Sequence, residues 1–258
     1  MDFKGKVALV TGSSRGIGRA TALRLAAGGA DLIVHYRQNE APAREVVGEI
    51  EALGRKAMAL RADLEKPSEI RRLFQGIKES FGRLDIFVAN AAATAFRDLL
   101  AVKEHNITRT YQLNVADFII SVQEAVPLMA GCQGRIVAIS SFPTHRYMPG
   151  YGTLASAKAA LESLVIYLAC ELAGRGINVN CVSPGLVRTD SARIYGGDDN
   201  DEFERSLIAA TPKGRAATPE EIANVIAFLC SAEAEWVTGQ TLLADGGLLL
   251  TAPYFRRR

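Results

Sequence analysis

A tyrosine and a lysine seven residues apart offer the clearest chemistry in this chain. Tyr151 and Lys158 stand at the two ends of the segment Tyr-Gly-Thr-Leu-Ala-Ser-Ala-Lys. On a helix, seven residues leave two side chains only about 20° apart around the axis, so the pair shares one face. A phenol can donate a proton to a substrate oxygen, and a nearby ammonium lowers the phenol pKa. We therefore predict that Tyr151 is a proton donor and that Lys158 supports it.

Two polar residues, Lys158 and Asn114, lie on helix faces that are otherwise apolar. Lys158 shares its face with Leu154 and Leu161, and a lysine there is costly unless it has partners. Asn114 lies at the edge of an apolar stripe on the preceding helix. Its carboxamide is either a satisfied polar group of the core or part of the same site as Lys158.

A glycine-rich segment predicts a phosphate-binding turn. Thr-Gly-Ser-Ser-Arg-Gly-Ile-Gly, residues 11–18, follows the first predicted strand and opens the first predicted helix. Glycines let the backbone approach a pyrophosphate, whose charge then lies at the helix N-terminus. The alternative is a glycine-rich turn without a ligand. We predict cofactor contacts from Gly12, Ser14, Arg15, Gly16, Ile17 and Gly18.

The end of the second predicted strand indicates which dinucleotide binds. An acidic residue there would bind the ribose 2′-hydroxyl of NAD, but the segment His35-Tyr36-Arg37 has none. Arg37 and Arg15 instead supply two guanidinium groups, which suit a 2′-phosphate. Two solvated surface arginines are the alternative. We predict that the cofactor is NADPH.

The elements that must position these residues alternate between short β-rich runs and longer helical patterns. Such alternation predicts an α/β fold, a Rossmann-like doubly wound parallel sheet of about seven strands with helices on both faces. The predicted strands are Val7–Val10, Leu32–Tyr36, Ala57–Arg61, Ile86–Ala89, Arg135–Ser140, Asn178–Val182 and Leu242–Ala244. The predicted helices lie near 16–28, 41–53, 67–81, 100–130, 153–174 and 219–231.

No repeat or linker divides the chain, so residues 1–258 are predicted to form a single domain. One long stretch, residues 186–213, has no predicted element, and a loop of that length is usually a lid or a disordered segment. Its position after a strand end favours a substrate lid.

Composition narrows the class of protein. The 258 residues are 48% hydrophobic and 22% charged, with a net charge of +2, as in ordinary globular proteins. The charge is too small and too dispersed to predict a nucleic-acid partner, and the apolar stretches are too short to predict a membrane span. The first residues lack a signal-peptide core, and the four cysteines lack metal-like spacing, so we expect a cytoplasmic protein without a metal site.

The spacing Thr-Gly-x-x-x-Gly-x-Gly, with Asn90-Ala91-Ala92 and Lys158, resembles the short-chain dehydrogenase/reductase family from end to end. The resemblance implies that Ser141 is the catalytic serine, that Asn114 supports a proton relay to Lys158, and that Lys158 holds the cofactor ribose. It further implies cofactor contacts from Asp63, Leu64, Asn90, Pro184, Gly185 and Thr189, with Asp63 at the adenine and Thr189 at the nicotinamide carboxamide. Asp63 has a structural alternative, which is capping its own turn.

In most of that family the tyrosine stands four residues before the lysine, where this chain has Leu154. Tyr151 instead gives the spacing Tyr-x6-Lys, and the segment 141–151 is similar to the FabL-type branch of enoyl-acyl-carrier-protein reductases. That branch implies an NADPH-dependent enzyme of fatty-acid biosynthesis that acts on substrates bound to acyl carrier protein or CoA. The family also implies a homo-oligomer, a dimer or homotetramer, paired through the helices near 100–130 and 153–174.

The displaced phenol suits reduction of an enoyl thioester. In a ketone, the hydride and the proton go to adjacent atoms, whereas in an enoyl thioester the hydride goes to Cβ and charge develops further away, on the thioester oxygen. A donor about one helical turn along fits the longer separation, because stabilisation acts where charge appears. Two alternatives stay open: a ketoreductase for 3-oxoacyl or polyketide carbonyls, and an inactive NADPH-binding module.

Overall fold

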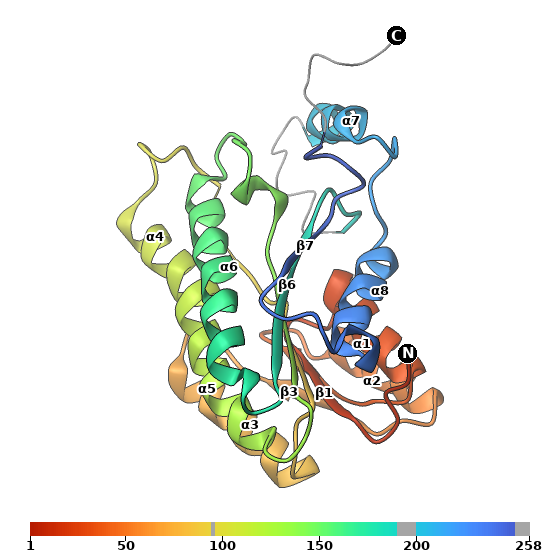
Figure 1. Cartoon of the computed structure of the whole chain (residues 1–258). Coiled ribbons are helices and arrows are strands. Elements are labelled where there is room, and N and C mark those ends of the chain that lie inside the picture. Colours follow the sequence, from red (N-terminus) through yellow and green to blue (C-terminus); the bar gives the residue numbers. More distant parts are fainter. Residues whose placement is uncertain (94–95, 190–199, 251–258) are drawn as a thin grey trace.

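The computed structural model describes residues 1–93, 96–189 and 200–250, and within them the chain builds one seven-stranded parallel sheet (Figure 1). The strand order is β3-β2-β1-β4-β5-β6-β7. The strands are β1 Val7–Val10, β2 Asp31–Tyr36, β3 Ala57–Arg61, β4 Ile86–Ala89, β5 Arg135–Ile139, β6 Asn178–Pro184 and β7 Thr241–Ala244. The predicted doubly wound α/β class is confirmed.

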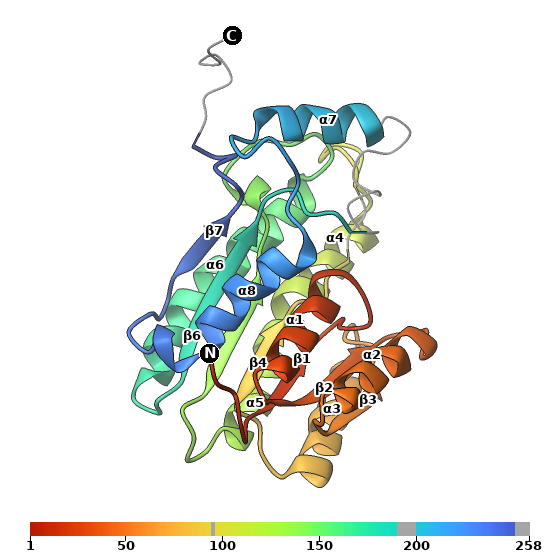
Figure 2. The same cartoon turned by 90° about the vertical axis from the view of Figure 1, so that its right-hand side faces the viewer.

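Helices cover both faces of the sheet (Figures 1 and 2). One face carries α1 Gly16–Ala27, α2 Ala41–Ala52 and α8 Pro219–Cys230. The other carries α3 Pro67–Phe81, α4 Glu104–Tyr111, α5 Asp117–Leu128 and α6 Gly152–Ala173. The helices predicted outside 100–130 are confirmed to within about a residue at each end.

Strand side chains alternate between two hydrophobic cores. In β1, Ala8 and Val10 pack under α1, α2 and α8, while Val7 and Leu9 pack under α3, α5 and α6. Strands buried on both faces read as continuous apolar runs, which is why β1 shows no alternation in the sequence. By length and apolar composition α6 could cross a membrane, but its buried face, with Leu161 and Val165, belongs to the second core.

The prediction of one helix near 100–130 is wrong in two respects. The helix begins at Glu104, and a π-helical segment, Gln112–Ala116, separates α4 from α5. Such a segment widens one helical turn and is often found at functional sites. Asn114 lies in the middle of it.

The predicted irregular stretch 186–213 is also wrong in part, because it contains the helix α7, Asn200–Ala210. Phe203 and Leu207 are half-buried at i, i+4 spacing, and acidic residues occupy the first turn, where the helix dipole favours them. Residues 190–199 lie outside the described residues, so the lid stays a prediction. Figures 1 and 2 show α7 beyond the carboxyl ends of the strands.

Candidate active site

The glycine-rich turn lies at the carboxyl end of β1 and is joined to the end of β4. Thr11 Oγ1 accepts hydrogen bonds from the N–H groups of Asn90 (2.9 Å) and Ala91 (3.0 Å). The Asn90 side chain donates in return to the Thr11 carbonyl, at 2.8 Å. Asn90 therefore braces this turn, next to the point where strand order reverses and where α/β folds bind ligands.

The turn has the shape that a pyrophosphate needs. Gly12 and Gly16 have φ angles of +64° and +56°, which favour glycine. A Cβ at Gly18 would lie 2.4 Å from the Gly12 carbonyl oxygen, so only glycine fits there. Arg15 precedes α1 in an extended conformation, and among the described residues no side chain caps the helix. The first N–H groups of α1 are thus left for an anion, as a bound dinucleotide would supply.

His35 ties this turn to the neighbouring strands, a role that the sequence analysis missed. The Gly12 N–H donates to His35 Nδ1 at 2.9 Å, and His35 Nε2 lies 3.0 Å from the Ala62 carbonyl oxygen. Because Nδ1 accepts, Nε2 carries the proton and the ring is neutral. Burial lowers the pKa of His35 to about 4, against the opposing effects of the Ala62 carbonyl and Asp63.

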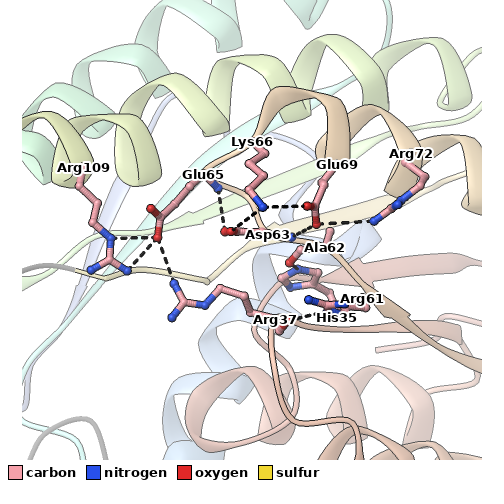
Figure 3. Close-up of polar contacts among 10 residues, drawn as sticks. All are labelled: His35, Arg37, Arg61, Ala62, Asp63, Glu65, Lys66, Glu69, Arg72 and Arg109. Carbon is pink, nitrogen blue, oxygen red and sulfur yellow. Dashed lines mark hydrogen bonds and ion pairs between the residues drawn. The ribbon is translucent and has the colours of Figure 1, made fainter.

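Arg37 is not an isolated surface arginine (Figure 3). Its guanidinium donates to Glu65 at 3.0 Å, and the same carboxylate oxygen accepts two hydrogen bonds from Arg109 of α4, at 2.8 and 2.9 Å. The Arg109 hydrogen bond is the main cause of a lowered Glu65 pKa. The sequence placed Arg37 at the strand end, but nothing in it marked Glu65 or Arg109 as partners.

Asp63 fills its structural role in the same region. Its carboxylate accepts from the Glu65 N–H at 3.3 Å, which caps the turn after β3. Leu64 beside it is buried. The cofactor contacts expected of both residues, with Asp63 at the adenine, stay predictions.

The predicted catalytic serine and tyrosine lie in contact. Ser141 Oγ is 3.0 Å from Tyr151 Oη, and only 3% of Tyr151 is exposed. Tyr151 occupies the N-cap position of α6, and its carbonyl accepts a hydrogen bond from the Ala155 N–H, so it is joined directly to the helix that carries Lys158. Leu154, at the usual tyrosine position, is a buried apolar residue. Tyr151 thus contacts the Ser141 hydroxyl and also the Phe96 ring. The centroids of the Phe96 and Tyr151 rings are 5.3 Å apart.

Lys158 is fully enclosed by the protein. Its ammonium donates to the Ile139 carbonyl at 2.8 Å, at the end of β5. Burial lowers its pKa to about 8, opposed by Cys181, Asp117 and Glu162. The lysine is therefore mostly cationic at neutral pH, as the prediction required.

Only the nitrogen of the Asn114 carboxamide has hydrogen-bond partners among the described residues. Its Nδ2 donates to the carbonyls of Thr110 (2.8 Å) and Ala93 (3.3 Å). Its Oδ1 is buried and accepts no hydrogen bond from the described residues. An orphaned buried acceptor is unusual and points to a ligand or water.

Glu162, one turn after Lys158, anchors the loop that carries Ser141. It accepts hydrogen bonds from Ser140 Oγ and from Thr144 Oγ1 (3.1 Å), and His145 Nε2 lies 3.3 Å away. Nothing in the sequence marked Glu162 as a partner of this loop.

The loop that follows β6 reaches the glycine turn. A Cβ at Gly16 would lie 3.4 Å from Thr189 Cγ2, so Thr189 flanks the pyrophosphate turn. Pro184 ends the strand, and a Cβ at Gly185 would lie 2.8 Å from Asp245 Cα. The described part of the predicted site thus gathers at one edge of the sheet.

Comparisons with known proteins agree with this arrangement. The family model described as "Enoyl-(Acyl carrier protein) reductase" matches residues 12–249. The chain is 42% identical to "1-cyclohexenylcarbonyl-CoA reductase" of Streptomyces collinus, over 97% of this chain and 89% of that protein. It is 41% identical to "Hydroxynaphthalene reductase-like protein Arp2" of Metarhizium brunneum, over 94% of both.

Two solved structures share the whole fold. One is the promiscuous reductase LugOII, which catalyses keto-reduction at C1 during lugdunomycin biosynthesis, with 39% identity, a TM-score of 0.87 and coverage of 96% of this chain and 100% of that one. The other is the angucycline C-6 ketoreductase LanV with bound NADP, with 36% identity, a TM-score of 0.89 and coverage of 97% and 98%.

Proposed function

The chain belongs to the short-chain dehydrogenase/reductase family, and we propose that it is an NADPH-dependent reductase of α,β-unsaturated acyl thioesters. The observation that carries the proposal is the position of the phenol. Tyr151 stands seven residues before Lys158 and contacts Ser141, while the usual tyrosine position holds Leu154. This displacement suits a substrate in which charge develops away from the carbon that accepts the hydride.

The choice of NADPH is supported by Arg37 and by the absence of an acidic residue at the end of β2. LanV, at 36% identity, binds NADP. The glycine turn, with the uncapped N-terminus of α1, has the shape for the pyrophosphate. NADPH, when bound, supplies the hydride.

The protein side chains would handle the proton and the developing charge. Tyr151 would donate a hydrogen bond and then a proton to the enolate that forms when Cβ is reduced. Ser141, 3.0 Å from the phenol oxygen, would orient the phenol. The Lys158 ammonium would lower the phenol pKa by its charge, and Glu162 would hold the Ser141 loop in place.

The choice of a thioester substrate is supported by the name of a related enzyme. The substrate named for the Streptomyces collinus enzyme is a CoA thioester whose carbonyl is conjugated to a ring alkene. We extend that class to this chain and propose an acyl group carried on CoA or on acyl carrier protein.

A ketoreductase is the second candidate, because LugOII and LanV are described as reducing ketones. Either reaction needs one hydride and one proton. The two differ in where the oxygen lies relative to the carbon that is reduced.

A direct competition between substrates tests the proposal. NADPH oxidation is followed with crotonyl-CoA and with acetoacetyl-CoA, and we expect kcat/KM to favour the enoyl substrate at least about tenfold, or about 1.4 kcal/mol in barrier. A preference for the ketone would assign the chain as a ketoreductase. No oxidation with either substrate, despite NADPH binding, would support an inactive binding module.

A further inference from the structure

The carboxyl group of Asp117 is buried beside Lys158 and has no role in the reaction proposed above. Asp117 is the first residue of α5, directly after the π-helical segment. The residue is only 6% exposed, and it forms none of the ion pairs found among the described residues. A carboxyl group buried without an ion-pair partner is costly when charged, so its presence at this position needs an explanation.

A small cavity links this carboxylate to the active site. Its volume is about 20 Å³, and the polar residues that line it are Thr11, Asn114, Asp117, Ser121 and Lys158. A cavity of this size holds about one water molecule, and a buried water needs two to four polar partners. Asn114 Oδ1, which is buried without a partner among the described residues, is one acceptor that such a water would satisfy.

Burial shifts the pKa values of the two ionisable groups at the cavity in opposite directions, because it favours the neutral form of each. Burial raises the pKa of Asp117 to about 8, opposed by the Lys158 charge and the Phe118 N–H. Burial lowers that of Lys158 to about 8, opposed by Cys181 of β6, Asp117 and Glu162 of α6. Opposite shifts of this kind lower the free energy of a proton transfer from the Asp117 acid to a neutral Lys158 amine.

We propose that Asp117 is a buried proton store for Lys158, connected to it through the water-sized cavity. The inference rests on the proposed reductase function, but it applies equally to an enoyl and to a ketone substrate. When Lys158 gives up a proton towards the Tyr151 phenolate, its ammonium becomes an amine. The Asp117 carboxylic acid then passes its proton through the cavity water to that amine. The products are a carboxylate and an ammonium, and solvent returns one proton to Asp117 before the next turnover.

The first test examines the protein without substrate. Infrared difference spectra of wild type against Asp117→Asn at pH 7 should show a protonated carboxylic acid band that the variant lacks. Glu124→Gln is the matched control, since Glu124 lies on the same helix but pairs with Arg71 at the surface. Absence of the acid band from wild type would overturn the proposal, whatever substrate the enzyme prefers.

The second test measures turnover with the preferred substrate. Asp117→Asn has the shape of the neutral acid, so we expect unchanged NADPH affinity, a kcat about tenfold lower and a larger solvent deuterium isotope effect on kcat. Wild-type kcat and isotope effect in this variant would refute the proton store. Asp117→Gly should recover activity with added formate but not with formamide, which has the same size and no acidic proton. Equal recovery with both would show that the site only needs to be filled.

Discussion

Replacing Glu65 with Gln should tighten NADPH binding while leaving NADH binding almost unchanged. The Glu65 carboxylate accepts a hydrogen bond from the Arg37 guanidinium at 3.0 Å and also accepts one from Arg109 at 2.8 Å. A 2′-phosphate bound by Arg37 must either share the guanidinium with the Glu65 carboxylate or displace that carboxylate. Glutamine keeps the size of the side chain and removes the charge.

The expected size of the effect follows from the charges and their exposure. At neutral pH a phosphate monoester carries a charge of about −1.5 to −2. Unit charges about 4 Å apart interact by about 1 kcal/mol in water and about 4 kcal/mol at an effective dielectric near 20. Glu65 is 27% exposed and Arg37 is 40% exposed, so screening favours the low end of that range. Loss of about 1–2 kcal/mol of repulsion lowers the NADPH Kd about five- to thirtyfold.

The assay is a titration of NADPH fluorescence, repeated with NADH, on wild type and Glu65→Gln. Glu69→Gln is the matched control, because Glu69 lies one turn away in the same polar cluster but contacts the Asp63 N–H and Lys66 instead of Arg37 (Figure 3). The control should change both affinities less than about twofold. Weaker NADPH binding by Glu65→Gln would show that Glu65 orients Arg37 for the phosphate. Equal changes in the affinities for both cofactors would show that Arg37 does not bind the 2′-phosphate.

Four other changes test the site. Arg37→Asp should weaken NADPH binding at least about tenfold and NADH binding much less, by the same titration; an equal loss would indicate a role in folding. Tyr151→Phe should lower kcat about 10²–10⁴-fold with NADPH affinity nearly intact, and a kcat within threefold of wild type would exclude it as the acid. Glu162→Ala should lower kcat because the loop that carries Ser141 loses its anchor. Glu162→Gln can still accept hydrogen bonds and should retain most of the wild-type kcat. Identical kcat values in the two variants would show that Glu162 does not position the loop. The unfolded chain protonates His35 near pH 6.5 but the folded chain only near pH 4, so stability should fall as pH drops from 6.5 towards 4, by up to about 3 kcal/mol. Urea titrations of wild type and His35→Gln at pH 7 and pH 5 should show a smaller loss in the variant, and equal losses would contradict the assignment.

The sequence alone determined the parts of this protein that depend on short-range patterns. Apolar runs bounded by turn residues located all seven strands, because a strand buried on both faces needs a continuous run wherever it lies in the sheet. The glycine turn was predictable because the positive φ angles of Gly12 and Gly16 and the contact of Gly18 with the Gly12 carbonyl arise within a few residues of backbone. The distance from Tyr151 to Lys158 along a helix follows from helical geometry, so the displaced phenol was visible before the fold was known.

Tertiary structure decided what each of these residues touches. Arg37 and Arg109 both bind the Glu65 carboxylate only because the ends of β2, β3 and α4 converge, and the three residues are far apart in the chain. The neutral state of His35 and the buried state of Asp117 depend on how much water the packed sheet excludes, which no local spacing encodes. The π-helical turn at Asn114 was likewise not predictable, because the sequence of residues 112–116 is compatible with an ordinary α-helix.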